Sequence, residues 1–190
     1  MTEGTEKPSV ATWVEQVLGY WFGELDRAGW FRKSAATDAA IRHRFANLLE
    51  TLRSADIDTL LTDQRTALAA IVVLDQFPRN IHRDTPQAFA SDGKARELAE
   101  AVVARGFDQG LTVEQRLFMA LPFEHSEHIE DQDRAVELIS ALGDAEYTRY
   151  AEAHRDVIRR FGRFPHRNAI LGRASTEAEQ AYLAQPGSGF

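Results

Sequence analysis

The stretch Ala67-Leu68-Ala69-Ala70-Ile71-Val72-Val73-Leu74 is an unbroken apolar run of eight residues, and it ends at the carboxylate of Asp75. Its alanine and leucine content favours a buried helix over a strand, with Thr62 as the expected N-cap and Pro78 as the expected end. Eight apolar residues are far fewer than the roughly 20 that a membrane-spanning helix needs. The run therefore predicts a helix in the core of a protein that does not span a membrane.

Helical periodicity continues outside this stretch, and no run of alternating apolar and polar residues indicates a strand. After Thr37, an expected N-cap, one helix face collects the apolar side chains of Ile41, Phe45, Leu48, Leu49 and Leu52. Further apolar stripes over residues 136–142 and 147–161 end near Gly143 and Gly162. These patterns predict an all-α fold.

Three further helix starts carry recognisable signals. Thr112 is followed three residues later by Gln115, and Thr176 by Glu179, which is the spacing of a capping box. Thr85 is followed by Pro86, and proline is favoured at the first position of a helix. We therefore expect helices to begin at these three points.

A weak internal repeat relates two joins of the chain, Phe77-Pro78-Arg79-Asn80 and Phe164-Pro165-His166-Arg167-Asn168. In each we expect proline to stop a helix and the Arg-Asn pair to lie in the following turn. Three antiparallel helix pairs would then stack in a short solenoid, a tetratricopeptide-like superhelix or bundle. We predict a single all-α domain over residues 9–184, with flexible ends at 1–8 and 185–190.

Composition excludes several classes of function. The 190 residues include no cysteine, which rules out disulfides, thiolate metal sites and a cysteine nucleophile. A net charge of -7 argues against a binder of nucleic acid or of an anionic membrane. The acids Glu3 and Glu6 precede any apolar run, so we expect no secretory signal and a cytoplasmic location. Glycine-rich phosphate or dinucleotide loops and the Gly-x-Ser-x-Gly elbow are also missing.

Asp75 is the first candidate for chemistry. It continues the helix face of Leu68, Ile71 and Val72, so its carboxylate is expected to point into the interior, where it needs a partner. Arg79, one turn later, is the local candidate. Two interpretations stay open: a buried Asp–Arg clasp that holds helices together, or a catalytic or ligand-facing carboxylate.

The segment Glu124-His125-Ser126-Glu127-His128 is the second candidate. Its spacing does not match that of zinc proteases or of di-iron bundles, and we expect no metal and no cofactor. General acid–base work by His125 or Glu127 is one interpretation, and ordinary hydrogen bonding at a helix end is the other.

The third candidate is a basic block between residues 154 and 173, where six arginines face the single acid Asp156. The arginines are Arg155, Arg159, Arg160, Arg163, Arg167 and Arg173. They form either a network with the acids of residues 124–133 or a pocket that grips a carboxylate or phosphate. His154, among apolar neighbours, is expected to be a hydrogen-bonded core histidine. The aromatic residues Trp13, Tyr20, Trp21, Phe22, Trp30 and Phe31 are expected to pack in the core, with a partner-binding groove as the alternative.

Four motifs together resemble the bacterial domain-of-unknown-function family 924, of the tetratricopeptide-like helical superfamily. They are Val17-Leu18-Gly19-Tyr20-Trp21-Phe22-Gly23, Leu74-Asp75-Gln76-Phe77-Pro78-Arg79-Asn80, Pro122-Phe123-Glu124-His125-Ser126-Glu127 and Arg160-Phe161-Gly162-Arg163-Phe164-Pro165-His166-Arg167-Asn168. The resemblance covers residues 10–183 and implies stacked helical hairpins, without a substrate, cofactor or catalytic residue. His128 departs from the acid that is more common in that family.

The sequence thus predicts an all-α protein whose polar motifs converge on one cleft that binds a small anionic ligand or an acidic peptide end. The predicted lining is Asp75, Arg79, Asn80, His125, Glu127, His154, Arg163, His166, Arg167 and Asn168. One alternative is a metal-independent enzyme in which His125, Asp75 or Glu127 is the acid or base and an arginine stabilises negative charge. The other is a protein-interaction scaffold. The sequence does not indicate an oligomeric state.

Overall fold

A computed structural model describes residues 12–189, and this part of the chain contains helices and no strand. The all-α prediction is therefore confirmed. The helices are α1 (Trp13–Gly19), α2 (Arg27–Phe31), α3 (Ala35–Ser54), α4 (Ile57–Leu60), α5 (Gln64–Ile71), α6 (Phe77–Ile81), α7 (Asp92–Ala104), α8 (Val113–Glu124), α9 (Ile129–Ser140), α10 (Ala145–Phe161) and α11 (Glu177–Leu183). The predicted flexible N-terminus, 1–8, lies outside the described residues. The domain limits and the C-terminal tail stay predictions.

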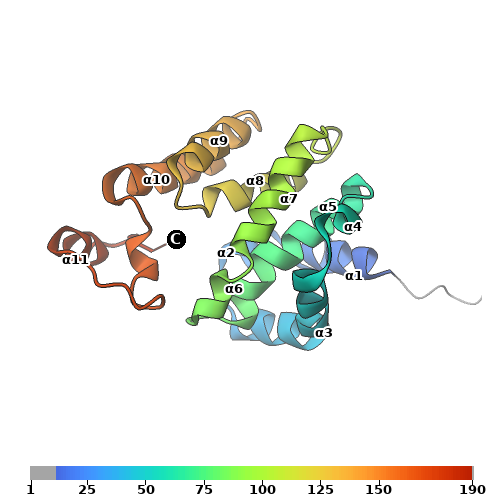
Figure 1. Ribbon diagram of the computed structural model, residues 1–190, viewed down its shortest axis with the longest axis horizontal. Helices are drawn as coiled ribbons and strands as arrows, with labels where there is room; N and C mark the ends of the chain where they lie inside the picture. Colours follow the sequence, from blue (N-terminus) through green and yellow to red (C-terminus); the bar gives the residue numbers. More distant parts are fainter. Residues whose placement is uncertain (1–11, 190) are drawn as a thin grey trace, which may run out of the picture.

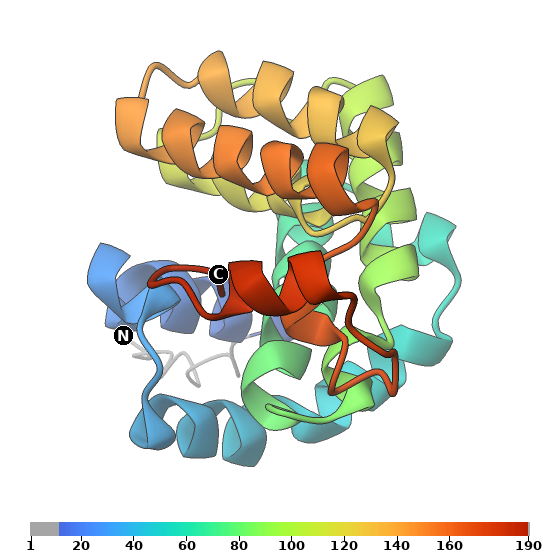
Figure 2. The same ribbon diagram turned by 90° about the vertical axis from the view of Figure 1, so that its left-hand side faces the viewer.

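Helices that follow one another along the chain mostly pack against one another. α9 and α10 form a long antiparallel pair that packs on α8 (Figure 1). α7 packs against both α8 and α5, and α3 packs against α6. In the turned view the α9–α10 pair and α3 lie at opposite ends of the molecule, with α11 at middle height (Figure 2). The tetratricopeptide-like superhelix stays a prediction.

The core is one large apolar cluster with a smaller one beside it. The large cluster runs from α1 to α10, and the smaller one contains Val157, Ile158 and Phe164. Phe118 of α8 is fully buried, and its ring contacts those of Trp21, Phe22, Trp30 and Phe31. The predicted core role of this aromatic group is thus observed, although Phe31 is 56% exposed.

The expectation that Pro78 stops a helix is wrong. Helical structure runs without a break from α5 through a π-helical segment, Val72–Gln76, into α6, and Pro78 is the second residue of α6. In this segment the N–H of Phe77 donates to the carbonyl of Val72, five residues back. A proline lacks an N–H and its ring collides with the carbonyl four residues earlier, and the wider π-turn accommodates both constraints. Arg79 and Asn80 consequently lie within a helix, not in a turn.

Local capping signals were mostly correct. The capping boxes of Thr112 and Thr176 are both present, and Pro86 begins a short 3-10 helix, Pro86–Phe89. Gly162 ends α10 in the left-handed conformation, at φ 69°, where a residue without a Cβ is favoured.

Two predicted caps are wrong, and in each the true cap lies nearby. The side chain of Ser34, not Thr37, caps α3, and that of Asp63, not Thr62, caps α5. An N-cap side chain must reach the N–H two or three residues later. Thr37 is itself the donor that Ser34 caps, and Asp63 accepts from Arg65 and Thr66. Within residues 12–189, no helix has both the length and the apolar character that crossing a membrane requires.

Candidate functional site

Asp75 lies in the π-helical segment and is fully buried, as its helix face predicted. One carboxylate oxygen, Oδ1, lies 2.8 Å from Nδ1 of His125 and 3.5 Å from Nη1 of Arg79. The other, Oδ2, accepts a hydrogen bond of 2.6 Å from the side chain of Gln76. Burial opposes the charge of Asp75, but His125 and Arg79 outweigh it and hold the pKa of the carboxyl below its usual value. Of its two ionisable partners, the closer is therefore a histidine 50 residues away, and Arg79 is the more distant one.

His125 is the C-cap residue of α8, and its backbone is fixed from both sides. Its N–H donates to the carbonyl of Leu121 at 2.9 Å. The fully buried amide of Gln132 donates to the carbonyls of Glu124 and Ser126, at 2.6 and 2.7 Å. The side chain of His125 keeps 16% exposure. Burial, followed by the charge of Arg79, lowers the pKa of His125, so the ring is neutral near pH 7.

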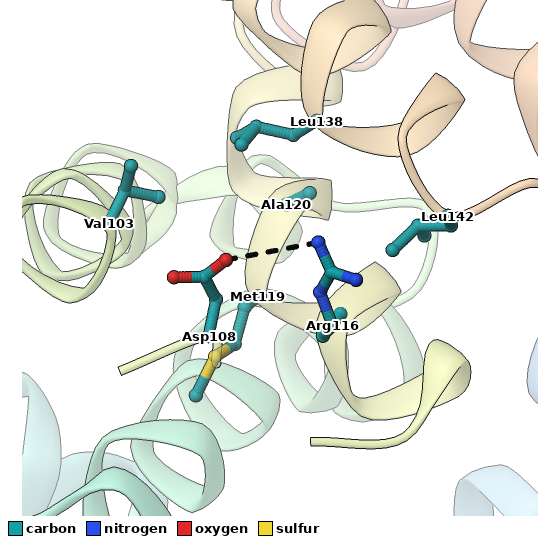
Figure 3. A pocket seen from close by; sticks show the side chains of 7 residues that line it. All are labelled: Val103, Asp108, Arg116, Met119, Ala120, Leu138 and Leu142. Atoms are coloured by element: carbon teal, nitrogen blue, oxygen red, sulfur yellow. Dashed lines mark ion pairs between the residues drawn. The ribbon is translucent and has the colours of Figure 1, made fainter. Parts of the chain in front are cut away.

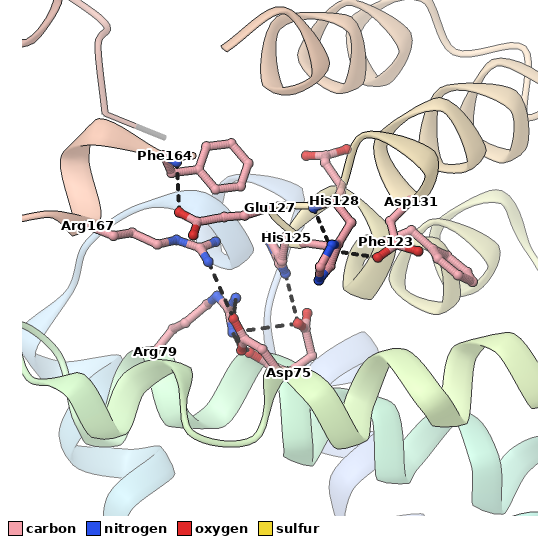
Figure 4. Close-up of polar contacts among 12 residues, drawn as sticks. Asp75, Arg79, Phe123, His125, Glu127, His128, Asp131, Phe164 and Arg167 are labelled. Carbon is pink, nitrogen blue, oxygen red and sulfur yellow. Dashed lines mark hydrogen bonds and ion pairs between the residues drawn. The ribbon is translucent and has the colours of Figure 1, made fainter. Parts of the chain in front are cut away.

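Two arginines from distant elements converge beside this pair. Arg79 donates two hydrogen bonds to the carboxylate of Asp92, at 2.9 and 3.0 Å, and another to the carbonyl of Asp75. Arg167, from the 3-10 helix Pro165–Arg167, approaches the same Asp92 to 3.6 Å. Figure 4 shows the two guanidinium groups close together.

Arg167 is the least satisfied charge in this group. It is only 7% exposed, and its guanidinium lies over the rings of Phe89 and Phe164, at 4.7 and 4.6 Å from their centroids. Its Nε atom is buried without a hydrogen-bond partner among the described residues. Burial and then repulsion from Arg79 lower the pKa of Arg167 to about 10.

Glu124 and His154 form a second buried pair. Nδ1 of His154 lies 3.2 Å from Oε1 of Glu124 and 2.8 Å from the carbonyl of Tyr150, so this nitrogen carries the proton. Burial, assisted by the charge of Asp75, raises the pKa of Glu124 to about 8. Burial lowers the pKa of His154 to about 3. Both side chains are thus mainly neutral near pH 7, and His154 is the hydrogen-bonded core histidine that the sequence indicated.

The C-terminal segment is fastened to the helical body through Glu127. The carboxylate of Glu127 accepts from Arg173 at 2.7 and 2.9 Å and from the N–H of Phe164 at 2.7 Å. These bonds place the 3-10 helix that carries His166 and Arg167 over the Asp75 region (Figure 4). Burial, then the charge of Arg167, lowers the pKa of His166 to about 4.

The structure brings together most, but not all, of the predicted lining. Asp75 contacts Arg79 and His125 directly, and Arg167 joins them through Asp92, which it shares with Arg79. Glu127, His154 and His166 lie close by. Three residues are engaged elsewhere. Asn80 donates to Asp38 at 2.8 Å, Arg163 donates to Glu179 at 2.6 and 2.8 Å, and Asn168 bonds Ser175 and Arg173.

Much of the basic block serves an internal network, which was one of the two interpretations left open. Arg159 lies 2.8 Å and Arg155 3.7 Å from Asp133, and Arg173 pairs with Glu127. Arg167 is the member of the block that turns inward. The anion-pocket interpretation thus depends on one arginine of the block, together with Arg79.

Sequence reasoning did not find Asp92 or Phe89, which contact both arginines. Asp92 lies in the first turn of α7, where an acid is ordinarily explained by the helix dipole, so its position carried no distinguishing signal. Gln132 was missed as well, because an isolated glutamine within a helix indicates no particular role.

Two hollows lie outside this polar cluster. A cavity of about 10 Å³ between α7, α8 and α9 is lined by apolar side chains and by Asp108 and Arg116, which are 3.9 Å apart (Figure 3). An open groove of about 490 Å³ runs past Glu127, Ile129, Ile158 and Arg159. The cavity of about 10 Å³ has space for about one water molecule. Among the described residues, no group of three or more His, Asp and Glu side chains is placed to hold a metal ion.

Comparison with known proteins gives a family but no activity. A search of curated proteins finds no match. A solved structure of a protein of unknown function from Agrobacterium tumefaciens is similar, with 38% sequence identity and a TM-score of 0.86. The similarity covers 90% of this chain and 96% of that one. The family model described as bacterial protein of unknown function (DUF924) matches residues 17–187. By this match and by the resemblance of its Phe-Pro and His-Ser-Glu motifs, the chain belongs to the bacterial family DUF924.

Proposed function

We propose that the protein binds a small oxyanion, a carboxylate or a phosphate, through the guanidinium of Arg167. The observation that carries this proposal is that the side chain of Arg167 is 7% exposed, its Nε is buried without a hydrogen-bond partner among the described residues, and its Nη1 approaches Asp92 only to 3.6 Å. A buried N–H of a guanidinium without a hydrogen-bond acceptor is costly, and native proteins satisfy such groups. An oxyanion would supply the missing acceptors.

The chemistry of the surroundings fits a ligand with two oxygen atoms. The planar guanidinium group presents paired N–H donors that match a carboxylate or phosphate. Asp92 already occupies Arg79 with two bonds, but it approaches Arg167 only to 3.6 Å. The side chains of Arg79, His125 and Asp92 are each between 16 and 20% exposed, which leaves the cluster partly open to solvent.

An acidic peptide end would present the same carboxylate and is a second form of this ligand. The interaction scaffold is the competing function, in which Arg167 serves only to hold the C-terminal segment in place. A cytoplasmic location remains our expectation from the sequence.

Thermal melting against inorganic phosphate, sulfate, succinate and a peptide with a free C-terminus tests the proposal. At 100 times its dissociation constant an anion stabilises the protein by about 2.7 kcal/mol, which raises the Tm by roughly 5–10 °C for a chain of this size. Arg167→Gln should abolish the shift. Arg160→Gln is the matched control, because Arg160 is exposed and lies over the ring of Phe161.

A second measurement separates ligand binding from a structural role. Arg167→Met keeps an apolar stem against Phe89 and Phe164 but removes the buried charge. If Arg167 serves a ligand, the Tm without anions should stay equal or rise. A lower Tm for Arg167→Met, together with no response of the unsubstituted protein to any anion, would support the scaffold instead.

A further inference from the structure

We propose that the Asp75–His125 pair is a general base, and that the protein uses it to hydrolyse small carboxylic esters whose second, free carboxylate is held by Arg167. This inference rests on the proposed oxyanion site and adds a reaction to it. It is carried by the geometry of His125, by its fixed position and by its neighbours.

The contact between the two side chains determines which nitrogen of His125 is basic. An ionised carboxylate only accepts hydrogen bonds, so the 2.8 Å contact places the proton on Nδ1 of His125. The lone pair is then on Nε2. A carboxylate that orients a histidine in this way is the arrangement used by general bases in hydrolytic sites.

Nothing in the described part of the chain uses that lone pair. The side chain of His125 makes one hydrogen bond there, to Asp75. A histidine that only joined two helices would be expected to have both ring nitrogens satisfied by protein groups, because it is largely buried. His125 instead keeps 16% exposure while Asp75 has none, so solvent and a ligand reach the imidazole and not the carboxylate.

The pair is also rigid, which general-base catalysis requires. Gln76 and Arg79 bind Asp75 from its own helix, and Gln132 holds the carbonyls on both sides of His125. Asp75 lies in the π-helical segment, and such segments occur often at functional sites. The ring is therefore held in one orientation without the help of a substrate.

Arg79 supplies the positive charge that the reaction needs. Its guanidinium lies 3.5 Å from the carboxylate that orients His125, and it adjoins Arg167. In the proposed complex, an ester is anchored by its free carboxylate on Arg167 and has its carbonyl group beside Arg79 and His125. Arginine at that point stabilises the negative oxygen that forms during attack.

The step balances with water as the only co-reactant. Nε2 of His125 takes a proton from water while the water oxygen forms a bond to the carbonyl carbon, and the carbonyl oxygen becomes negative. The intermediate collapses as the bond between the carbonyl carbon and the alkoxy oxygen breaks. That oxygen receives the proton from Nε2, so an ester and water give an acid and an alcohol, and His125 is again neutral.

The test uses the full chain with mono-4-nitrophenyl succinate, which carries a free carboxylate, and with neutral 4-nitrophenyl acetate. We expect a higher kcat/KM for the succinate ester. His125→Gln and Asp75→Asn should each lower that value by about 10²–10⁴-fold. The control His43→Gln, on the exposed face of α3, should leave it unchanged. Circular dichroism verifies that each variant is folded.

The pH profile distinguishes His125 from an exposed histidine. Burial and Arg79 lower the pKa of His125. As the pH decreases, kcat/KM should therefore begin to fall only at a pH below 6.5, the ordinary pKa of histidine. The groups that face it are Asp75, Arg79, Asp92, His154 and His166. Asp75→Asn removes the orienting carboxylate, so the fall in the remaining activity should move to a different pH.

The outcomes separate the two proposals. Hydrolysis no faster than in buffer, or an undiminished rate in His125→Gln, overturns the general-base assignment. If phosphate or succinate still raises the Tm of that variant, the oxyanion site stands without the reaction. If no anion shifts the Tm of the unsubstituted protein and no ester is hydrolysed, both proposals are wrong.

Discussion

Arg173 grips the carboxylate of Glu127 through two hydrogen bonds, of 2.7 and 2.9 Å, across 46 residues of sequence. The same carboxylate accepts from the N–H of Phe164. Glu127 is thus the point at which the C-terminal segment, with Arg167, is joined to the end of α8. The position of Arg167 depends on an ion pair that lies outside the cluster itself.

Replacing Glu127 by glutamine should loosen this attachment. The amide of glutamine is uncharged and has one oxygen, so it cannot accept both hydrogen bonds from Arg173. Hydrogen bonds to charged groups contribute about 1.5–3 kcal/mol each, and solvent exposure reduces this contribution. We expect a total loss of about 1–3 kcal/mol and a lower Tm by thermal melting. Glu152→Gln, on the exposed face of α10, is the control and should melt as the unsubstituted protein does.

The raised pKa of Glu124 predicts that stability falls as the pH rises from about 4.5 to about 8. Its pKa is about 8 in the folded protein against 4.5 for the ordinary side chain, so the folded state holds a proton that the unfolded chain has released. The free energy of unfolding should fall between these pH values, by up to about 1.4 kcal/mol per pH unit. Glu124→Gln removes the titration and keeps an oxygen for His154.

Urea denaturation of Glu124→Gln and of the unsubstituted protein, at about pH 5 and pH 8, measures this effect. The advantage of the variant should grow with pH. Curves that stay parallel at both pH values would contradict a protonated Glu124.

His154 predicts the opposite trend in acid. Its pKa is about 3 in the folded protein and 6.5 ordinarily, so below pH 6.5 the unfolded chain takes up a proton that the folded state refuses. Stability should therefore fall as pH drops from 6.5 toward 3, with His166 adding to the effect. In urea denaturation, His154→Gln should make the free energy of unfolding depend less steeply on pH. The same pH dependence in His154→Gln and in the control His43→Gln would contradict the lowered pKa of His154.

Phe118 is the centre of the aromatic cluster, and its loss should be severe. Truncating a fully buried phenylalanine removes apolar contacts and leaves a cavity, at a cost of about 3–5 kcal/mol. Phe31→Ala, whose ring is 56% exposed, should cost much less. Urea denaturation midpoints compare the two variants. Equal losses of stability would show that the buried ring of Phe118 contributes no more to the core than the exposed ring of Phe31.

Local features of the fold could be predicted because the determinants are close in sequence. The capping boxes of Thr112 and Thr176 and the left-handed Gly162 each depend on residues within one helical turn. The burial of Asp75 followed from the same kind of reasoning, since its helix face was already apolar.

The partners within the site could not be predicted in the same way. His125 is 50 residues from Asp75, and Asp92 meets Arg167 only because the C-terminal segment folds back over α7. The pairing of Arg163 with Glu179 could not be predicted for the same reason, because Glu179 lies on a short helix whose docking no local pattern reveals. Tertiary packing decides which of several arginines turns inward.

The π-helical segment at Val72–Gln76 determines how the helical residues after it are rotated about the helix axis. The segment contains one residue more than the same length of α-helix would. This extra residue rotates the following part of the helix by about 100° relative to an unbroken α-helix. Deleting Val73 would restore regular α-helical spacing and bring the ring of Pro78 against a carbonyl one turn earlier. It would also rotate α5 relative to Asp75 and Arg79. An alignment gap of one residue at this place would thus mark a chain in which Asp75 and Arg79 are turned together, away from the direction that the buried face of α5 now gives them.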